Sequence, residues 1–154
     1  MKRGQAFSVV TAAALGTAAL LVASCKSEEP APAGTSWETM THDQRAAFMK
    51  ETVLPRMKAA FTTFEHEEFA GMNCATCHGA SAKDKTFKMP NPELPRLPTD
   101  EAGWNALEAE EPEAMKFMRG TVVPQMAALL GEKPYDPATQ KGFGCFECHT
   151  AEAK

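Results

Sequence analysis

Two short segments of the sequence place a pair of cysteines directly before a histidine. Residues 74–78 read Cys-Ala-Thr-Cys-His and residues 145–149 read Cys-Phe-Glu-Cys-His, so both follow the pattern Cys-x-x-Cys-His. Two thiols three positions apart on one helical turn can form thioethers with the two vinyl groups of one haem, and the adjacent histidine then directs its imidazole at the iron. The sequence therefore predicts two c-type haems, attached through Cys74, Cys77, Cys145 and Cys148 and ligated by His78 and His149.

The same cysteine spacing also occurs in zinc sites and in redox-active dithiols. A zinc ion held by the four cysteines would leave both histidines without a role. A thioredoxin-like dithiol needs a βαβ setting, which the composition disfavours, because only three valines and no isoleucine follow residue 24 and strands draw on β-branched residues. Zinc and dithiol chemistry therefore stay as alternatives to haem.

An internal repeat indicates which residues face the histidines across each iron. Residues 48–61 and 117–130 align at an offset of 69 and are identical at seven of fourteen positions. The repeated side chains able to bind iron are methionines, since neither His42 nor His66 has a counterpart in the second block. We therefore expect a methionine as the sixth ligand of each haem, from the inner pair Met57 and Met126 or the outer pair Met49 and Met118.

Two other residues are alternatives for the first haem alone. Met89 lies in a proline-rich segment after the first motif, and this segment resembles the methionine loop of single-haem class I cytochromes. His66 would give the first haem two histidine ligands, but its acidic neighbours favour a solvent-exposed position. His42 is expected at the surface, at the start of a helix.

A methionine on a helix, followed by a turn and Cys-x-x-Cys-His, resembles the haem-binding repeat of the cytochrome subunit of photosynthetic reaction centres and its small multihaem relatives. The resemblance covers residues 45–78 and 114–149, and this chain has two repeats rather than four. It implies a mainly α fold, a small multihaem cytochrome c with two tandem helix-turn-motif repeats, long irregular loops and no substantial sheet. It also implies two axial pairs, Met57 with His78 and Met126 with His149.

The composition indicates a core that a cofactor completes. Only 17 of the 130 residues after position 24 are Leu, Val or Phe, and none is Ile. That is about 13%, against the roughly 20% below which chains tend not to fold alone. Two buried porphyrins would supply the missing apolar surface, so we expect the haem-free chain to be mostly unfolded.

Local signals predict the elements that would carry these residues. A capping box, Thr41-x-x-Gln44, begins the first helix, Thr99 or Asp100 can cap a helix that starts near residue 101, and Gly131 ends the last helix. The residues 79–98 contain four prolines and are expected to form an irregular strap over the first haem. The first haem motif is expected in a loop or short turn. The predicted helices span residues 42–53, 55–65, 101–110, 112 to about 120 or 123, and 124–130, with prolines at 55, 112 and 124 opening or kinking them.

The start of the chain predicts export and lipidation. Residues 1–24 combine a positive start with an apolar run, as an export signal does, and the residues up to Cys25 resemble the lipobox of bacterial lipoproteins. The alternative is a signal anchor that stays as a transmembrane helix. If Cys25 is lipidated, the five cysteines are four thioethers and one lipidated N-terminus, with no free thiol. The predicted organisation is a signal peptide over 1–24, a flexible tether over 25–36 and a dihaem domain over 37–154, with repeats over 37–98 and 99–154.

Haems with strong ligands on both faces leave no open position for a substrate, which favours an electron carrier over an enzyme. The sequence thus predicts a dihaem cytochrome lipoprotein on a bacterial membrane, facing the periplasm or the cell surface, and Lys26 favours the outer membrane. The formal net charge of −4 excludes a nucleic-acid partner and favours redox proteins with a basic docking patch. The alternatives are a haem enzyme or gas sensor with one open iron, and a haem-bearing accessory subunit of a larger oxidoreductase.

Overall fold

The computed structural model describes residues 36–153. The chain divides into two units, residues 1–33 and 34–154, and every described residue belongs to the second. The predicted signal peptide, the lipidation site Cys25 and all of the predicted tether except Ser36 lie outside the described residues. No helix among residues 36–153 is long and apolar enough to cross a membrane.

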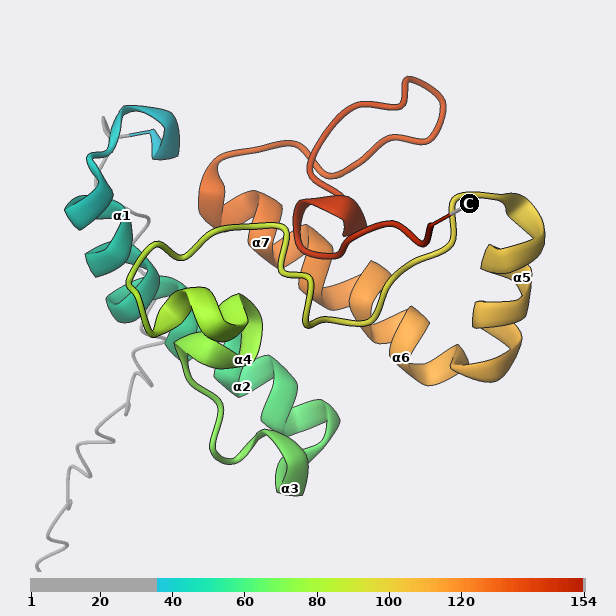
Figure 1. Ribbon diagram of the computed structural model, residues 1–154, viewed down its shortest axis with the longest axis horizontal. Coiled ribbons are helices and arrows are strands. Elements are labelled where there is room, and N and C mark those ends of the chain that lie inside the picture. Colours follow the sequence, from blue (N-terminus) through green and yellow to red (C-terminus); the bar gives the residue numbers. More distant parts are fainter. Residues whose placement is uncertain (1–35, 154) are drawn as a thin grey trace, which may run out of the picture. The chain divides into compact units, whose positions relative to one another are not determined.

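The described residues form helices joined by irregular segments, as the sequence predicts (Figure 1). Their β structure consists of isolated bridges and no sheet. Apart from short 3-10 turns and two long helices, the chain forms three separate helices: α3 (His66–Phe69), α4 (Cys74–His78) and α5 (Glu101–Glu110). Two longer helices dominate, and each joins two α segments through a π-helical turn: α1 (His42–Phe48), η2 (Met49–Val53) and α2 (Leu54–Phe64), then α6 (Pro112–Phe117), η4 (Met118–Val122) and α7 (Val123–Leu130).

The two π turns occupy equivalent positions, each just before a proline. In the first, the backbone N–H of Leu54 donates to the carbonyl of Met49, and in the second that of Val123 donates to Met118. A proline inside a helix lacks an N–H and its ring clashes with the carbonyl four residues earlier. The widened π turn lets the chain accommodate Pro55 and Pro124 without ending the helix. The two helices predicted around Pro55 are therefore one continuous helix with a local distortion, and so are the two predicted around Pro124, whereas α5 and α6 on either side of Pro112 are separate.

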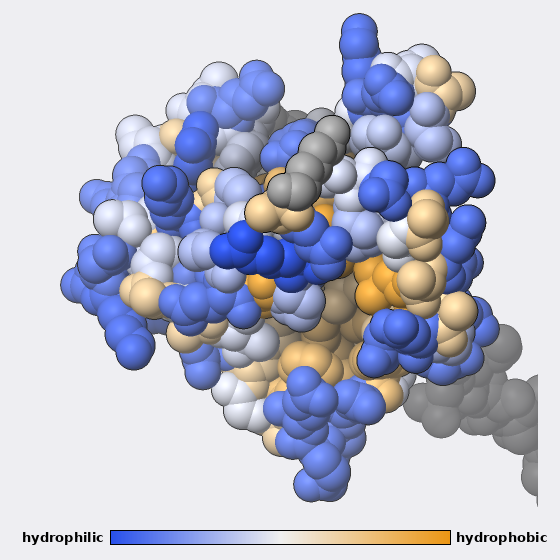
Figure 2. All heavy atoms as spheres, turned by 45° about the vertical axis from the view of Figure 1, so that its right-hand side comes forward, coloured by the Kyte–Doolittle hydropathy of each residue, from blue (hydrophilic) through white to orange (hydrophobic). Residues whose placement is uncertain are grey.

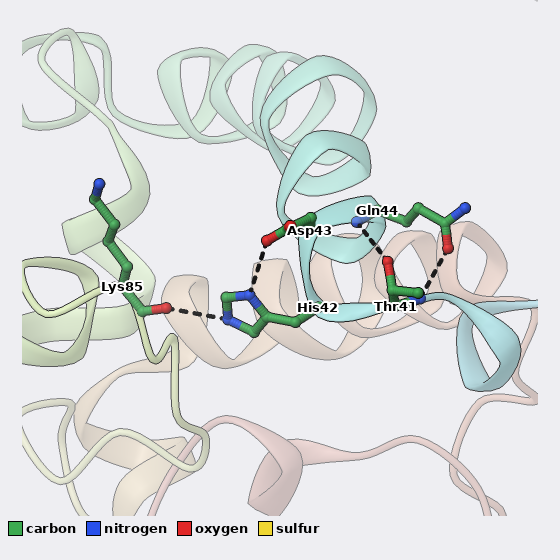
Figure 3. Close-up of polar contacts among 5 residues, drawn as sticks. All are labelled: Thr41, His42, Asp43, Gln44 and Lys85. Atoms are coloured by element: carbon green, nitrogen blue, oxygen red, sulfur yellow. Dashed lines mark hydrogen bonds and ion pairs between the residues drawn. The ribbon is translucent and has the colours of Figure 1, made fainter.

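The predicted helix ends are confirmed. Thr41 and Gln44 form the capping box, with Thr41 Oγ1 accepting from the Gln44 N–H at 3.3 Å and Gln44 Oε1 accepting from the Thr41 N–H at 2.8 Å (Figure 3). The Asp100 side chain caps α5 by accepting from the Gly103 N–H at 2.9 Å. Gly131 closes α7 in the left-handed conformation, at φ +73°, which glycine adopts without steric cost.

His42 lies at the surface, and it also connects two parts of the fold. Its Nε2 is 3.1 Å from the carbonyl oxygen of Lys85, and because a carbonyl only accepts, Nε2 is the donor. Its Nδ1 is 3.5 Å from Asp43 (Figure 3). Lys85 belongs to the strap, so this contact ties the strap to the start of the first long helix.

The core consists of two small apolar clusters that the long helices share. The first cluster is Val53, Met57, Phe61 and Met72, and the second is Ala127, Leu130 and Phe143. Residues of η4 and α7 pack on the first cluster, and residues of α1 and η2 pack on the second. No large side chain among the described residues is fully enclosed. The protein's own side chains thus make a thin core, as the composition indicates.

Candidate haem-binding sites

The second motif begins in a short 3-10 turn, η5 (Cys145–Glu147), and its histidine is oriented by the backbone. His149 Nδ1 lies 2.9 Å from the carbonyl oxygen of Pro95. A carbonyl only accepts, so the proton is on Nδ1 and the lone pair is on Nε2. A backbone or carboxylate partner of this kind is how proteins fix the tautomer and ring direction of a metal-binding histidine. This contact leaves Nε2 of His149 as the atom whose lone pair a metal ion would bind.

An apolar cavity of about 370 Å³ adjoins this histidine. Its volume lies within the roughly 300–1,000 Å³ typical of ligand pockets. The second motif contributes Cys145, Cys148 and His149 to its lining, and the second long helix contributes Met115, Met118 and Met126. On the face shown in Figure 2, apolar side chains also gather in a recess that hydrophilic residues surround. Two thiols, an oriented imidazole and thioether side chains around an apolar space fit the chemistry of a c-type haem.

The structure brings together the predicted ligands of the second haem and adds one that the sequence reasoning missed. Met126 packs on the second cluster, as does Cys148, and Met118 also lines the cavity. Met115 lines it as well and is only 8% exposed. The repeat gave no hint of Met115, because the aligned position in the first half is Ala46. Its spacing of three from Met118, which puts both on one helix face, is the signal that could have found it.

The first motif folds into the short helix α4, which is more regular than the predicted loop or turn. Asn73 caps it, with Asn73 Oδ1 accepting from the Ala75 N–H at 2.9 Å. Met57 is 3% exposed, and Cys77 packs against the cluster that contains it. The predicted ligand and the predicted attachment site therefore lie beside one cluster in this half too.

The alternative ligands of the first haem lie in different parts of the fold. Met49 packs against both apolar clusters. Met89 is half-buried in the strap, and His66 is exposed at the start of α3. Neither Met89 nor His66 belongs to the cluster that Cys77 packs against.

His78 is half-buried beside Phe87. Burial lowers the pKa of His78, and the backbone of Phe87 partly opposes this shift. The Nδ1 atom is buried and has no hydrogen bond of regular geometry within the described residues. The ring centroids of Phe87 and His78 lie 5.4 Å apart in an edge-on arrangement. The backbone of Phe87 has a positive φ of +49°. A neutral imidazole is the form that binds a metal ion, so this environment suits an axial ligand.

The motif thiols are in apolar surroundings. Burial raises the pKa of Cys148 to about 12, and the nearby thiol of Cys77 adds to this shift. Burial also raises the pKa of Cys77 and that of Cys145. Redox-active dithiols have lowered pKa values instead. Within residues 36–153 no three histidine, cysteine or acidic side chains gather as a zinc ion would require.

The strap, predicted as an irregular segment over the first haem, contacts both motifs. Its beginning stays at the first motif, where Ser81 Oγ donates to the carbonyl of His78 at 2.6 Å. Its later part, residues 91–97, runs beside residues 148–152 (Figure 1). The Leu97 N–H donates to the Thr150 carbonyl, and the Glu152 N–H donates to the Leu97 carbonyl, both at 2.9 Å. The prolines predicted an irregular segment but carried no information about its partner.

Comparisons of the chain with protein-family models, with curated proteins and with solved structures found no match.

Proposed function

We propose that this chain is a dihaem c-type cytochrome that carries electrons. The observation that carries the proposal is the apolar cavity, in which two cysteines and an oriented histidine of one motif face methionines of a long helix. When bound, each haem would supply a one-electron ferric/ferrous couple.

The residues around the second site have three roles in this proposal. Cys145 and Cys148 attach the haem, and the Pro95 carbonyl holds His149 in the tautomer whose Nε2 binds iron. The apolar lining excludes water, which favours the less charged, reduced state of the iron. The thioether of Met126 is the proposed sixth ligand, and methionine in that position raises the reduction potential.

The first site is proposed by the same reasoning. Cys74 and Cys77 are its attachment points, and His78 and Met57 are its axial ligands. Two features support a tandem repeat of one ancestral unit. The repeated sequence blocks contain the two π turns, and each block precedes one haem motif. A long helix with a π turn followed by Cys-x-x-Cys-His is therefore the proposed repeating unit.

For the chain as a whole we propose an exported lipoprotein anchored at Cys25, at the outer membrane, that exchanges electrons with other redox proteins. The acidic composition supports a partner with a basic docking surface. We propose no catalytic residue, because an iron with ligands on both faces has no position for a substrate.

A spectroelectrochemical titration of the haem-loaded protein tests the proposal. We expect two reversible one-electron steps and reduced-state bands typical of six-coordinate low-spin c-type haem. Reduced protein should not bind carbon monoxide unless a ligand is displaced. Ready binding of carbon monoxide at one iron would favour the enzyme or gas-sensor alternative and contradict the proposal.

A further inference from the structure

Asn91 is a buried polar residue placed between the two Cys-x-x-Cys-His motifs. It is 3% exposed. Its side-chain Nδ2 donates to the carbonyl oxygen of Cys77 at 3.0 Å. Its backbone N–H donates to the carbonyl oxygen of Cys148 at 2.9 Å. One residue of the strap therefore hydrogen-bonds to the second cysteine of both motifs.

The orientation of the Asn91 amide follows from its contacts. Asn91 Oδ1 accepts from the backbone N–H of Glu93 at 2.9 Å, so the oxygen is already assigned to a donor. Nδ2 then faces the Cys77 carbonyl, which needs a donor. A flipped amide would place Oδ1 against the carbonyl oxygen of Cys77, two acceptors, and Nδ2 against the N–H of Glu93, two donors.

The surroundings of Asn91 leave its side chain little freedom. Gly79, directly after His78, has φ +55°, and a Cβ added there would lie 2.8 Å from Asn91 Oδ1 and 2.9 Å from Nδ2. Real Cβ atoms are not found at such distances, so the close approach requires glycine at position 79. The strap backbone next to Asn91 is held by the Leu97 and Thr150 pairing already described.

We propose that Asn91 is a positioning residue that fixes the separation and mutual orientation of the two haems, so that electrons pass between them within one chain. This inference rests on the proposed function. Cys77 and Cys148 are the proposed attachment points next to the two axial histidines. A residue that hydrogen-bonds to both of their carbonyls sets how far apart the attachment points lie. Electron transfer weakens steeply with distance, so a fixed short separation makes the two irons an internal relay.

The test compares three variants of the full-length, haem-loaded protein. Asn91→Asp keeps the shape and the acceptor for Glu93 but removes the donor to Cys77. Asn91→Ala removes the side chain without adding a buried charge. Asn105→Asp is the matched control, because Asn105 is exposed on α5 and gains the same charge. Haem content is measured first, by mass spectrometry of the intact chains.

The readout is the magnetic coupling between the two ferric irons in the fully oxidised protein, measured by EPR. We expect clear coupling in the parent and in Asn105→Asp. In both Asn91 variants we expect it to fall by roughly twofold or more, because loss of a supporting contact loosens a site by about an ångström. A parent that carries two haems without coupled irons overturns the inference, and so does unchanged coupling in Asn91→Ala. A parent without haem would instead contradict the proposed function itself.

Discussion

The imidazole Nδ1 of His149 lies 2.9 Å from the carbonyl oxygen of Pro95, a residue 54 positions earlier in the chain. Pro95 belongs to the strap that follows the first haem motif. The histidine of the second half is thus oriented by the first half. The two repeats proposed from the sequence are therefore interdependent in the folded protein.

This dependence predicts that the second repeat does not form its site alone. Residues 99–154, exported by themselves in a host that attaches c-type haem, lack the Pro95 carbonyl and the pairing with residues 91–97. We expect little helix and a poorly defined haem spectrum from them, as measured by circular dichroism and absorbance. A spectrum of the isolated segment that matches the second haem of the full chain would contradict the interdependence.

The proposed sixth ligands predict paired losses. Met57→Ala and Met126→Ala should each remove one of the two methionine-to-iron bands, about half of the total intensity, and lower one reduction potential. The bands are read in the oxidised protein and the potentials by redox titration. Met115→Leu and Met118→Leu are the controls, because both side chains line the cavity and leucine keeps the apolar volume. Loss of a band in Met118→Leu with Met126→Ala unchanged would assign the second ligand to the outer methionine.

Two glycines predict opposite effects on stability. Gly142 has φ +105°, and a Cβ there would lie 2.5 Å from the Pro134 carbonyl oxygen. Gly142→Ala should destabilise the protein by about 2 kcal/mol or more. Gly120 lies in η4 with open space around it, so Gly120→Ala should stabilise it by up to about 1 kcal/mol. Denaturant unfolding of the haem-loaded variants measures both, and equal effects would refute the distinction.

The π turn η4 predicts the effect of a one-residue deletion. A π turn holds one residue more than the α-helix, so deleting Gly120 should restore a regular helix. Because the π turn absorbs one extra residue, removing that residue leaves the side chains before and after the turn in nearly the same relative directions, so Met115 and Met118 keep their orientation relative to Met126. We expect retained helicity and a retained ligand band of the second haem, with Gly120→Ala as the control. Loss of that band with helicity retained would mean that the π turn itself positions the ligand.

The acidic surface predicts salt-dependent electron transfer. Glu110 and Glu113 are exposed near the junction of α5 and α6. Transfer to a small basic redox protein, followed by stopped-flow absorbance, should slow as ionic strength rises, because salt screens the attraction between exposed charges. The double variant Glu110→Gln/Glu113→Gln should be slower at low salt and converge with the parent at high salt. A rate independent of salt in the parent would contradict docking on a basic patch.

Local signals made much of this fold predictable. The Thr41 capping box, the Asp100 cap and the Gly131 helix end depend on a few adjacent residues, and all three occur as predicted. The prolines at 55 and 124 correctly marked irregular points. The sequence pattern left open whether each proline would open a new helix or kink a continuous one, and the structure shows a continuous helix with a π turn at both positions.

The contacts that assemble the site were not predictable, because they join residues far apart in the chain. Asn91 has no motif around it that would indicate bonds to Cys77 and Cys148. Gly71 and Gly142 both precede a haem motif by three residues, yet only Gly142 has a positive φ. The positive φ that requires glycine therefore occurs only at the glycine of the second half.

Peptide mass spectrometry of the mature, exported protein tests the central claim most directly. The peptides containing residues 74–78 and 145–149 should each carry the mass of one haem, and no cysteine should react with a thiol reagent. Two unmodified peptides whose four cysteines are all alkylated would contradict the dihaem account.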